Sequence, residues 1–309
     1  MERNEVDENA MGGTELMGAG LEKYCDDELL SRFQIIRSRV RDIDPNRKII
    51  LWLHDLPQDP ESAHLRDPSS RARFEKIVMV SDWQMQMYNA YLGVPYGDCI
   101  VMKNAIDPIP AESIEKSREA IKLIYHPTPQ RGLQILVPVF EKLCELHDDI
   151  ELDVFSSFAL YGWHESDAEF ASLIERCKKH PKIRYHGAQP NDVVRKAVAR
   201  SHIFAYPSIW PETSCLCAME AMSGKNLIVA PNYAALPETT AGFAVMYQWN
   251  EDIEAHATVF FHELDNAINA WKGAGAALVE HLDAQKAYAD KMYAWQRRAA
   301  EWNELLRSL

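Results

Sequence analysis

The chain has 309 residues, 47% of them hydrophobic and 26% charged, which is the balance of a globular protein with room for two domains. Its formal net charge of −13 argues against a main role in holding nucleic acid phosphates, although a few basic groups and backbone amides would still bind a small anion. Because no run of about 18 apolar residues occurs and residues 1–15 lack an apolar core, we expect neither a transmembrane segment nor a secretory signal.

Strand-like and helix-like segments alternate along the chain, which predicts an α/β fold with parallel sheets and helices on both faces. A stretch of helical periodicity at 14–32 comes first. The segments expected next are strands at 33–38, 49–53, 76–80 and 99–103, with a helix at 83–92 between the last two. Residues 108–117, rich in Pro, Glu and Ser, then indicate a linker.

A second alternating pattern begins at residue 122. The strands expected in it are 123–125, 152–155, 183–186, 202–206, 227–230 and 244–247, separated by helical patterns. Six strands with this spacing predict a complete doubly wound domain. At the C-terminus, one helical face carries Tyr288, Met292, Trp295, Ala299, Trp302, Leu306 and Leu309. A face this apolar is expected to dock on another surface.

Ligands of open α/β sheets bind at the carboxyl ends of the strands, and the junction at 208–222 has unusual residue types there. Thr213 and Ser214 are expected to cap a helix. The free N–H groups of Ser214, Cys215 and Leu216 would then form an anion site.

The same junction carries two carboxylates, Glu212 and Glu220. A carboxylate accepts paired hydrogen bonds from sugar or ribose hydroxyls, so both are candidates for sugar recognition. The alternative is that Glu212 only supports the helix cap and that Glu220 is a solvated surface residue.

Other strand ends add further candidates. Arg131 follows the strand at 123–125 and is placed to reach a phosphate; a cation is disfavoured at a helix start, which favours function over a plain surface arginine. Gly12 and Gly13 form a turn that allows close backbone approach, a weak signal on its own. His54, at the end of the strand at 49–53, is a candidate at the same edge, with a structural role as the alternative.

Taken in order, these segments resemble the retaining glycosyltransferases of the large family four (group 1), whose GT-B fold consists of two facing Rossmann-like domains. Besides the Gly-Gly turn and His54, the resemblance rests on VMKNAID at 101–107, similar to V-x-N-G-x-D, and on HPTPQRGL at 126–133, similar to the R-x4-K-G phosphate loop. It is strongest over residues 206–238, where YPSIWPETSCLCAMEAMSGKNLIVAPNYAALPE is similar to the P-S…E-x7-E…E-A-M block.

The resemblance implies catalytic roles for Glu212, His54 and Arg131. Glu212 would contact hydroxyls of the donor sugar, His54 would lie near the reacting sugar carbon, and Arg131, at the family's lysine position, would neutralise the departing diphosphate. The donor nucleotide would be bound by Gly12, Gly13, His126, Arg131, Ser214, Cys215, Leu216 and Glu220, with Glu220 on the ribose hydroxyls. His126 stands where the family has an arginine, so its positive charge depends on protonation.

The resemblance also implies the domain boundaries. We expect an N-terminal Rossmann-like domain on the acceptor side at 1–110, completed by a C-terminal helix at 288–309, and a donor-binding domain at 119–287. The family normally has an apolar strand before the Gly-Gly turn, whereas residues 1–11 supply none. The N-terminal domain is therefore expected to be shortened, because a strand was lost or because this chain is one piece of a larger protein.

The expected reaction moves a sugar from a nucleoside-diphosphate sugar to an acceptor with retention of configuration. Because Arg131 and helix amides supply positive charge to the leaving group, no metal or other cofactor is expected. Asp42 and Asp44 spell a DxD metal motif, but they lie in a polar turn beside Pro45 where Asp is common. The acceptor stays open among a glycan, a lipid and a small molecule.

Two other functions remain as alternatives: a non-catalytic sugar-nucleotide binding module or subunit of a larger assembly, and another enzyme on this scaffold such as an epimerase or hydrolase. The six cysteines are scattered, with no pair or Cys/His cluster at zinc spacing, which indicates reduced thiols and a cytoplasmic location. Peripheral membrane contact stays open. The basic, apolar residues at 29–41 are interpreted as containing a buried strand in preference to an interfacial helix.

Overall fold

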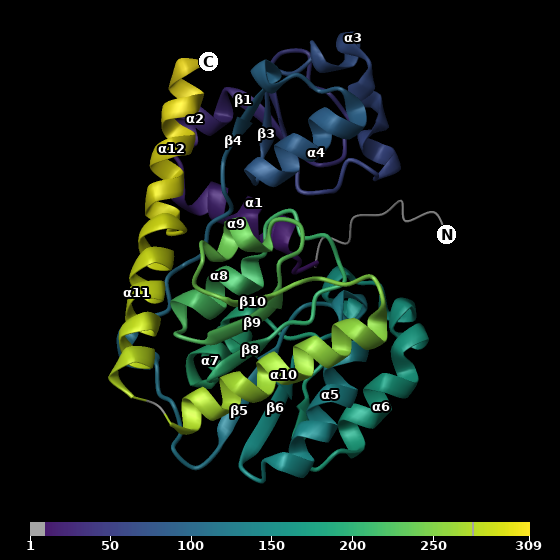
Figure 1. The fold of residues 1–309 in the computed structure, drawn as a ribbon. Coiled ribbons are helices and arrows are strands. Elements are labelled where there is room, and N and C mark those ends of the chain that lie inside the picture. The colour runs from purple at the N-terminus through teal and green to yellow at the C-terminus, as the bar shows by residue number, and fades with distance from the viewer. Residues whose placement is uncertain (1–9, 274) are drawn as a thin grey trace. The chain divides into compact units, whose positions relative to one another are not determined.

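The computed structural model describes residues 10–273 and 275–309, in which the chain forms two compact units (Figure 1). The first, here called the N-terminal unit, consists of Gly13–Asp107, Pro211–Leu216 and Lys291–Leu309. The second, the central unit, consists of Pro108–Trp210, Cys217–Asp290 and the described residues up to Gly12. The short segment 211–216, expected in the donor-binding domain, is thus grouped with the N-terminal unit. Residues 1–9, for which the sequence predicts no strand, lie outside the described residues.

The N-terminal unit is built on a four-stranded parallel sheet. Its strands are β1 (Phe33–Arg37), β2 (Lys48–Trp52), β3 (Lys76–Met79) and β4 (Cys99–Val101), in that order across the sheet. All four predicted strands are confirmed, with ends that differ by one or two residues. The pairing places Phe33 beside Lys48, Ile50 beside Lys76 and Ile77 beside Cys99.

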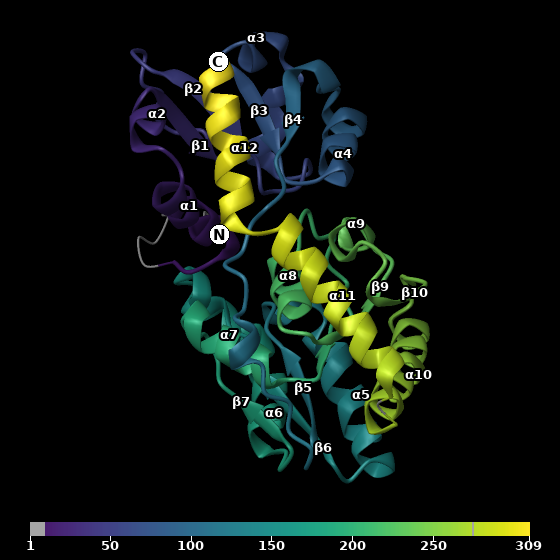
Figure 2. The same cartoon turned by 90° about the vertical axis from the view of Figure 1, so that its left-hand side faces the viewer.

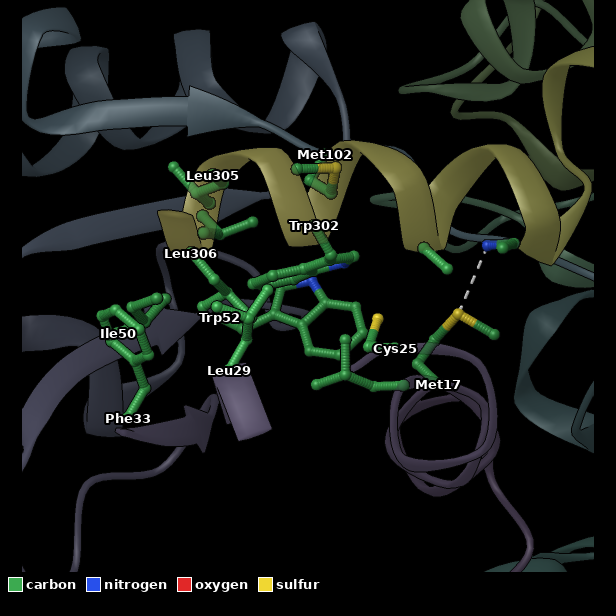
Figure 3. Close-up of a cluster of buried hydrophobic side chains, with 14 of the residues drawn as sticks. Met17, Cys25, Leu29, Phe33, Ile50, Trp52, Met102, Trp302, Leu305 and Leu306 are labelled. Atoms are coloured by element: carbon green, nitrogen blue, oxygen red, sulfur yellow. Dashed lines mark hydrogen bonds between the residues drawn. The ribbon is translucent and has the colours of Figure 1, made fainter. Parts of the chain in front are cut away.

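Helices cover both faces of this sheet, as the alternation of buried side chains along each strand requires. Ile50 and Trp52 point to the face covered by α1 (Gly13–Tyr24), α2 (Asp27–Ser31) and α12 (Trp295–Ser308), and Figure 3 shows their packing with Trp302 of α12. Ile49 and Leu51 point to the opposite face, which η1 (Pro60–Arg66) and α4 (Asp82–Leu92) cover. Two short helices, α3 (Pro68–Arg71) and η2 (Tyr96–Asp98), complete the unit.

Two helical predictions in this unit need correction. The stretch at 14–32 is not one helix, because α1 ends at Tyr24 and a second helix, α2, starts after Asp26. Asp26 caps α2 by accepting hydrogen bonds from the N–H groups of Glu28 and Leu29. The helix expected at 288–309 is also divided, into α11 (Ala276–Met292) and α12 (Figure 2). Neither break carries a Gly or Pro.

The break between α11 and α12 is caused by pairing with a distant strand end. The N–H of Ile106 donates to the carbonyl of Tyr293 at 2.8 Å, and the carbonyl of Ile106 accepts from the N–H of Trp295 at 3.2 Å. These bonds hold Ala294 in an extended conformation beside Ile106. The apolar face of α12 then docks on the sheet, where Trp302 is fully buried.

The central unit is built on a six-stranded parallel sheet in the order β10-β9-β8-β5-β6-β7. All six predicted strands are confirmed: β5 (Ile121–Tyr125), β6 (Ile150–Val154), β7 (Ile183–Tyr185), β8 (Ile203–Ala205), β9 (Leu227–Pro231) and β10 (Val245–Tyr247). The α-helices are α5 (Leu133–Leu146), α6 (Ala171–Lys179), α7 (Asn191–Arg200), α8 (Leu216–Ser223), α9 (Leu236–Thr240), α10 (Ile253–Lys272) and α11. The 3-10 helices are η3 (Ala111–Ser113), η4 (Pro129–Arg131), η5 (Phe158–Tyr161) and η6 (His164–Phe170).

The segment at 108–117, expected as a linker, packs on the central unit. The N–H of Ile109 donates to Ser223 Oγ at 2.8 Å, and Lys286 Nζ donates to the carbonyl of Ile109 at 2.5 Å. Further along, Lys116 Nζ donates to the carbonyls of Ser201 and of Gly224, the latter at 2.8 Å. The polar composition that indicated a linker therefore belongs to a segment fixed by buried lysines.

None of the described helices is long and apolar enough to cross a membrane.

Candidate functional site

In the central unit, the carboxyl end of β5 leads into the turn that carries Arg131. Arg131 Nε donates to Thr128 Oγ1 at 3.1 Å, and the guanidinium carbon lies 5.5 Å from the ring centroid of Trp210. The next residue, Gly132, has φ +131°, and a Cβ there would lie 2.2 Å from the carbonyl oxygen of Pro207. Only glycine fits this turn, which fixes Arg131 at the strand end.

Glu220 lies on α8 of the same unit and is 6% exposed, which excludes the interpretation of it as a solvated surface residue. Its Oε1 accepts a hydrogen bond of 2.9 Å from Asn191 Nδ2, at the start of α7. Burial raises the pKa of Glu220, while His126 and the Asn191 hydrogen bond act in the opposite direction. A buried carboxylate held by a single side-chain donor keeps further acceptor capacity for a ligand.

His126, directly after β5, is also buried and electrostatically coupled to Glu220. Burial lowers its pKa, but Cys217 and Glu220 raise it more, so the pKa of His126 lies above the ordinary value. Within the described part of the chain its Nε2 is buried without a hydrogen-bond partner. The position where the resemblance calls for an arginine therefore carries an imidazole that its surroundings favour as a cation.

The start of α8 differs from the expected capping. The helix begins at Leu216, so the residue before it is Cys215, and Thr213 and Ser214 lie further upstream. Thr213 is not a cap, because its Oγ1 donates to the carbonyl of His54 at 2.8 Å. Of the three amides expected to bind an anion, those of Ser214, Cys215 and Leu216, only that of Leu216 belongs to α8. The residues before it are not helical, because Thr213 is bonded to the end of β2.

Two of the expected donor-binding residues lie against each other in the N-terminal unit. Gly13 is the first residue of α1, and a Cβ on it would lie 3.1 Å from Leu216 Cδ1. Within the N-terminal unit, Gly13 can therefore approach Leu216 closely because it has no side chain. Gly12, the other glycine of the turn, is buried and is grouped with the central unit.

Glu212 and His54 belong to the N-terminal unit. Glu212 is 6% exposed. His54 is half-buried at the end of β2, with its ring centroid 4.6 Å from that of Trp52. Burial and the nearby charge of Arg37 lower the pKa of His54 to about 3, so its imidazole is neutral at pH 7.

Three residues near these groups were not singled out from the sequence: Asn191, Trp210 and Thr213 as a partner of His54. Trp210 lies within the 206–238 block two positions before Glu212, so the block itself offered a signal. Asn191 offered none, because an Asn at the start of a helix is ordinary.

The Asp42-x-Asp44 motif forms a turn in which Asp44 Oδ1 accepts from the N–H of Asn46 at 2.9 Å. Across the described residues, no three His, Cys, Asp or Glu side chains group as metal ligands would.

Comparison with known families identifies the region around Arg131 and Glu220. The family model described as "Glycosyl transferases group 1" matches residues 111–245, which contain β5 to the start of β10. Residues 111–245, here called the group 1 domain, are therefore similar to this family. The matched region of this group 1 domain includes His126, Arg131, Glu212 and Glu220.

Individual relatives agree with this assignment. A curated relative from Saccharomyces cerevisiae, the "Phosphatidylinositol N-acetylglucosaminyltransferase GPI3 subunit", is 24% identical over 143 residues, which are 46% of this chain. The match spans 30% of the length of that relative.

Solved structures extend the likeness in fold beyond the group 1 domain. A glycosyltransferase from Rickettsia africae ESF-5 matches with a TM-score of 0.69 at 17% identity, over 100% of this chain and 84% of that chain. Anabaena Alr3699/HepE, solved in complex with UDP-glucose, matches with a TM-score of 0.61 at 15% identity, over 85% of this chain and 73% of that chain. The two parallel α/β sheets have the fold of GT-B glycosyltransferases.

Proposed function

We propose that this chain is a retaining glycosyltransferase that moves a sugar from a nucleoside-diphosphate sugar to an acceptor without a metal ion. One observation carries the proposal: within the group 1 domain, Glu220 is a buried carboxylate held by Asn191 and coupled to His126 at a strand end. Such a group suits the recognition of vicinal hydroxyls, which donate two hydrogen bonds to one carboxylate. The solved complex of a GT-B relative with UDP-glucose supports this class of donor.

The leaving nucleoside diphosphate would be stabilised by positive groups of the central unit. Arg131 has a fixed place beside Trp210, and its planar guanidinium matches a phosphate. His126 adds a second positive charge when it is protonated, which Glu220 favours. Because these groups are positioned before the reaction, they stabilise the charge that develops on the diphosphate oxygens. We therefore propose that the reaction needs no metal.

The remaining roles follow the family resemblance. Glu212 would contact hydroxyls of the donor sugar, and His54, neutral at pH 7, would lie near the reacting carbon. Gly12, Gly13 and the amides of 214–216 would contact the phosphates. Retention would follow if the acceptor attacks on the face from which the diphosphate departs. The acceptor and a cytoplasmic location remain proposals on the same basis.

A second candidate is a sugar-nucleotide binding subunit that turns over its donor only within a larger assembly. The curated yeast relative is named as a subunit, and this chain matches only part of it. Donor turnover by the isolated chain would exclude this candidate. Binding of a nucleotide without any turnover would favour it.

The first test is calorimetric titration with UDP, GDP and ADP in the presence of EDTA, for the wild type and for Glu220→Ala. We expect one nucleotide to bind at micromolar concentration and the substitution to weaken it at least about tenfold, or about 1.4 kcal/mol. Glu145→Ala, on the exposed surface of α5, serves as a control for the loss of a carboxylate. Absence of binding up to millimolar concentration would contradict the proposal.

A further inference from the structure

The end of β1 and the connection that follows it contain four arginines, and three of them have partners within the N-terminal unit. Arg39 lies 3.6 Å from Asp59, Arg41 forms an ion pair of 2.8 Å with Glu61, and Arg47 donates to main-chain carbonyls, that of Leu30 among them. The fourth, Arg37, is exposed, and the described residues offer its guanidinium no hydrogen bond or ion pair.

The side chain of Arg37 nevertheless makes a close contact with α1. A Cβ built on Gly18 of α1 would lie 1.4 Å from Arg37 Nη1 and 2.5 Å from its Cζ. The guanidinium therefore lies directly on the helix backbone, in a notch that exists because residue 18 has no side chain. Glycine is disfavoured relative to alanine in the interior of a helix, so Gly18 makes α1 less stable than alanine would.

The position of Arg37 is the edge of the sheet at which ligands of such folds bind. Arg37 is the last residue of β1 and pairs in register with Trp52, the last residue of β2. The charge of Arg37 also lowers the pKa of His54, which lies two residues after Trp52 in the sequence. The pKa of the neighbouring acid, Asp55, is raised chiefly by burial, and its carboxyl group is hydrogen-bonded to Ser38.

We propose that Arg37 binds an anionic group, a phosphate or a carboxylate, of the acceptor. The inference deepens the proposed function and rests on it for the identity of the ligand as acceptor. A guanidinium that has no partner among the described residues, rests against the backbone of α1 and lies at the strand end next to that of His54 is placed for a two-pronged contact with an oxyanion. The donor diphosphate has its own cations in the central unit, Arg131 and His126.

Three variants test this role. Arg37→Gln removes the charge. Gly18→Ala leaves the charge but displaces the guanidinium from its notch, and because the Cβ meets only the end of a flexible side chain the fold is retained. Arg32→Gln is the matched control, since Arg32 is an exposed arginine at the opposite end of the same strand.

The wild type and each variant are saturated with the nucleotide that binds best and titrated at constant ionic strength with glucose, glucose 6-phosphate and glucuronate. A parallel arm measures sedimentation with phosphatidylcholine vesicles with and without phosphatidylglycerol. We expect the wild type to bind the anionic sugars, or the anionic vesicles, at least tenfold more tightly than the neutral counterpart. Arg37→Gln and Gly18→Ala should lose this preference, whereas Arg32→Gln should keep it. The arm that responds identifies a soluble acceptor or a lipid headgroup.

The inference is overturned if neither arm shows a preference for the anion, or if the preference survives in Arg37→Gln or disappears equally in Arg32→Gln. Its failure is distinct from failure of the proposed function, because nucleotide affinity is measured separately on the same samples. If no nucleotide binds, the same titrations with inorganic phosphate still decide whether Arg37 is an anion site.

Discussion

The side chain of Thr213 donates a hydrogen bond of 2.8 Å to the main-chain carbonyl of His54. This bond attaches the segment 211–216 to the end of β2, so Glu212 and His54 are held by one local arrangement within the N-terminal unit. Thr213 and His54, 159 positions apart in the sequence, are thus joined through a single hydroxyl.

Thr213→Val removes that hydroxyl at nearly constant volume and leaves the carbonyl of His54 without its donor. We expect donor turnover to fall at least tenfold while UDP affinity stays within a factor of two, because Glu220 and its partners belong to the central unit. Stability should fall by about 1 kcal/mol. Thr213→Ser, which keeps the donor, should retain turnover; equal losses in both variants would contradict the role of the hydrogen bond.

Glu220→Gln should lower the pKa of His126, since the carboxylate is one of the groups that raise it. The ring proton signals of His126 in NMR spectra recorded across a pH series report this pKa directly. Asn191→Ala should raise the pKa of Glu220, because it removes a hydrogen bond that lowers this pKa. An unchanged His126 titration in Glu220→Gln would show that the two side chains are not coupled.

Acid should destabilise the central unit through His202. Its Nδ1 accepts from the N–H of Lys122 at 3.0 Å, and its Nε2 lies 2.9 Å from the carbonyl of Ser117. Burial lowers the pKa of His202 to about 4, so between pH 6.5 and pH 4 the unfolded chain binds more protons than the folded chain. Stability contributed by this group is therefore complete above pH 6.5 and is lost as the pH falls towards 4. Urea unfolding of wild type and His202→Gln at pH 7 and pH 5 should show a smaller pH effect in the variant.

Gly20→Ala should destabilise the N-terminal unit by about 1–3 kcal/mol. A Cβ at this position would lie 2.0 Å from the ring of Trp295, which is buried and cannot move aside as the end of Arg37 can at Gly18. Gly18→Ala is the matched comparison on the same helix and should be neutral or stabilising. Thermal unfolding of the two variants measures the difference, and equal midpoints would contradict the packing described here.

The strands were predictable because their signal is local. Ile49 to Leu53 is a continuous apolar run, and in the fold its members are divided between the two faces of the sheet. The interruption between α11 and α12 was not predictable, because its cause is the distant Ile106 and the break itself contains only Tyr293 and Ala294. The end of α1 was partly visible, since Asp26 is an ordinary N-cap residue.

The candidate site shows the same division. Arg131, Glu212 and Glu220 could be named as candidates because they stand in a recognisable order along one stretch of chain. Asn191 and the notch at Gly18 were missed, because each acts on a residue that the fold, not the sequence, brings beside it. Trp210 could have been found, as it lies inside the block that drew attention to Glu212.

The docking of α12 has a consequence for the order in which the protein becomes complete during synthesis. The strands of the N-terminal unit are made first, yet Trp302 and Leu306, which fill one side of their core, are among the last residues of the chain. All the strands of the central unit are translated before these residues appear. The part of the apolar face that α12 covers is therefore completed only after every strand of the central unit has been made.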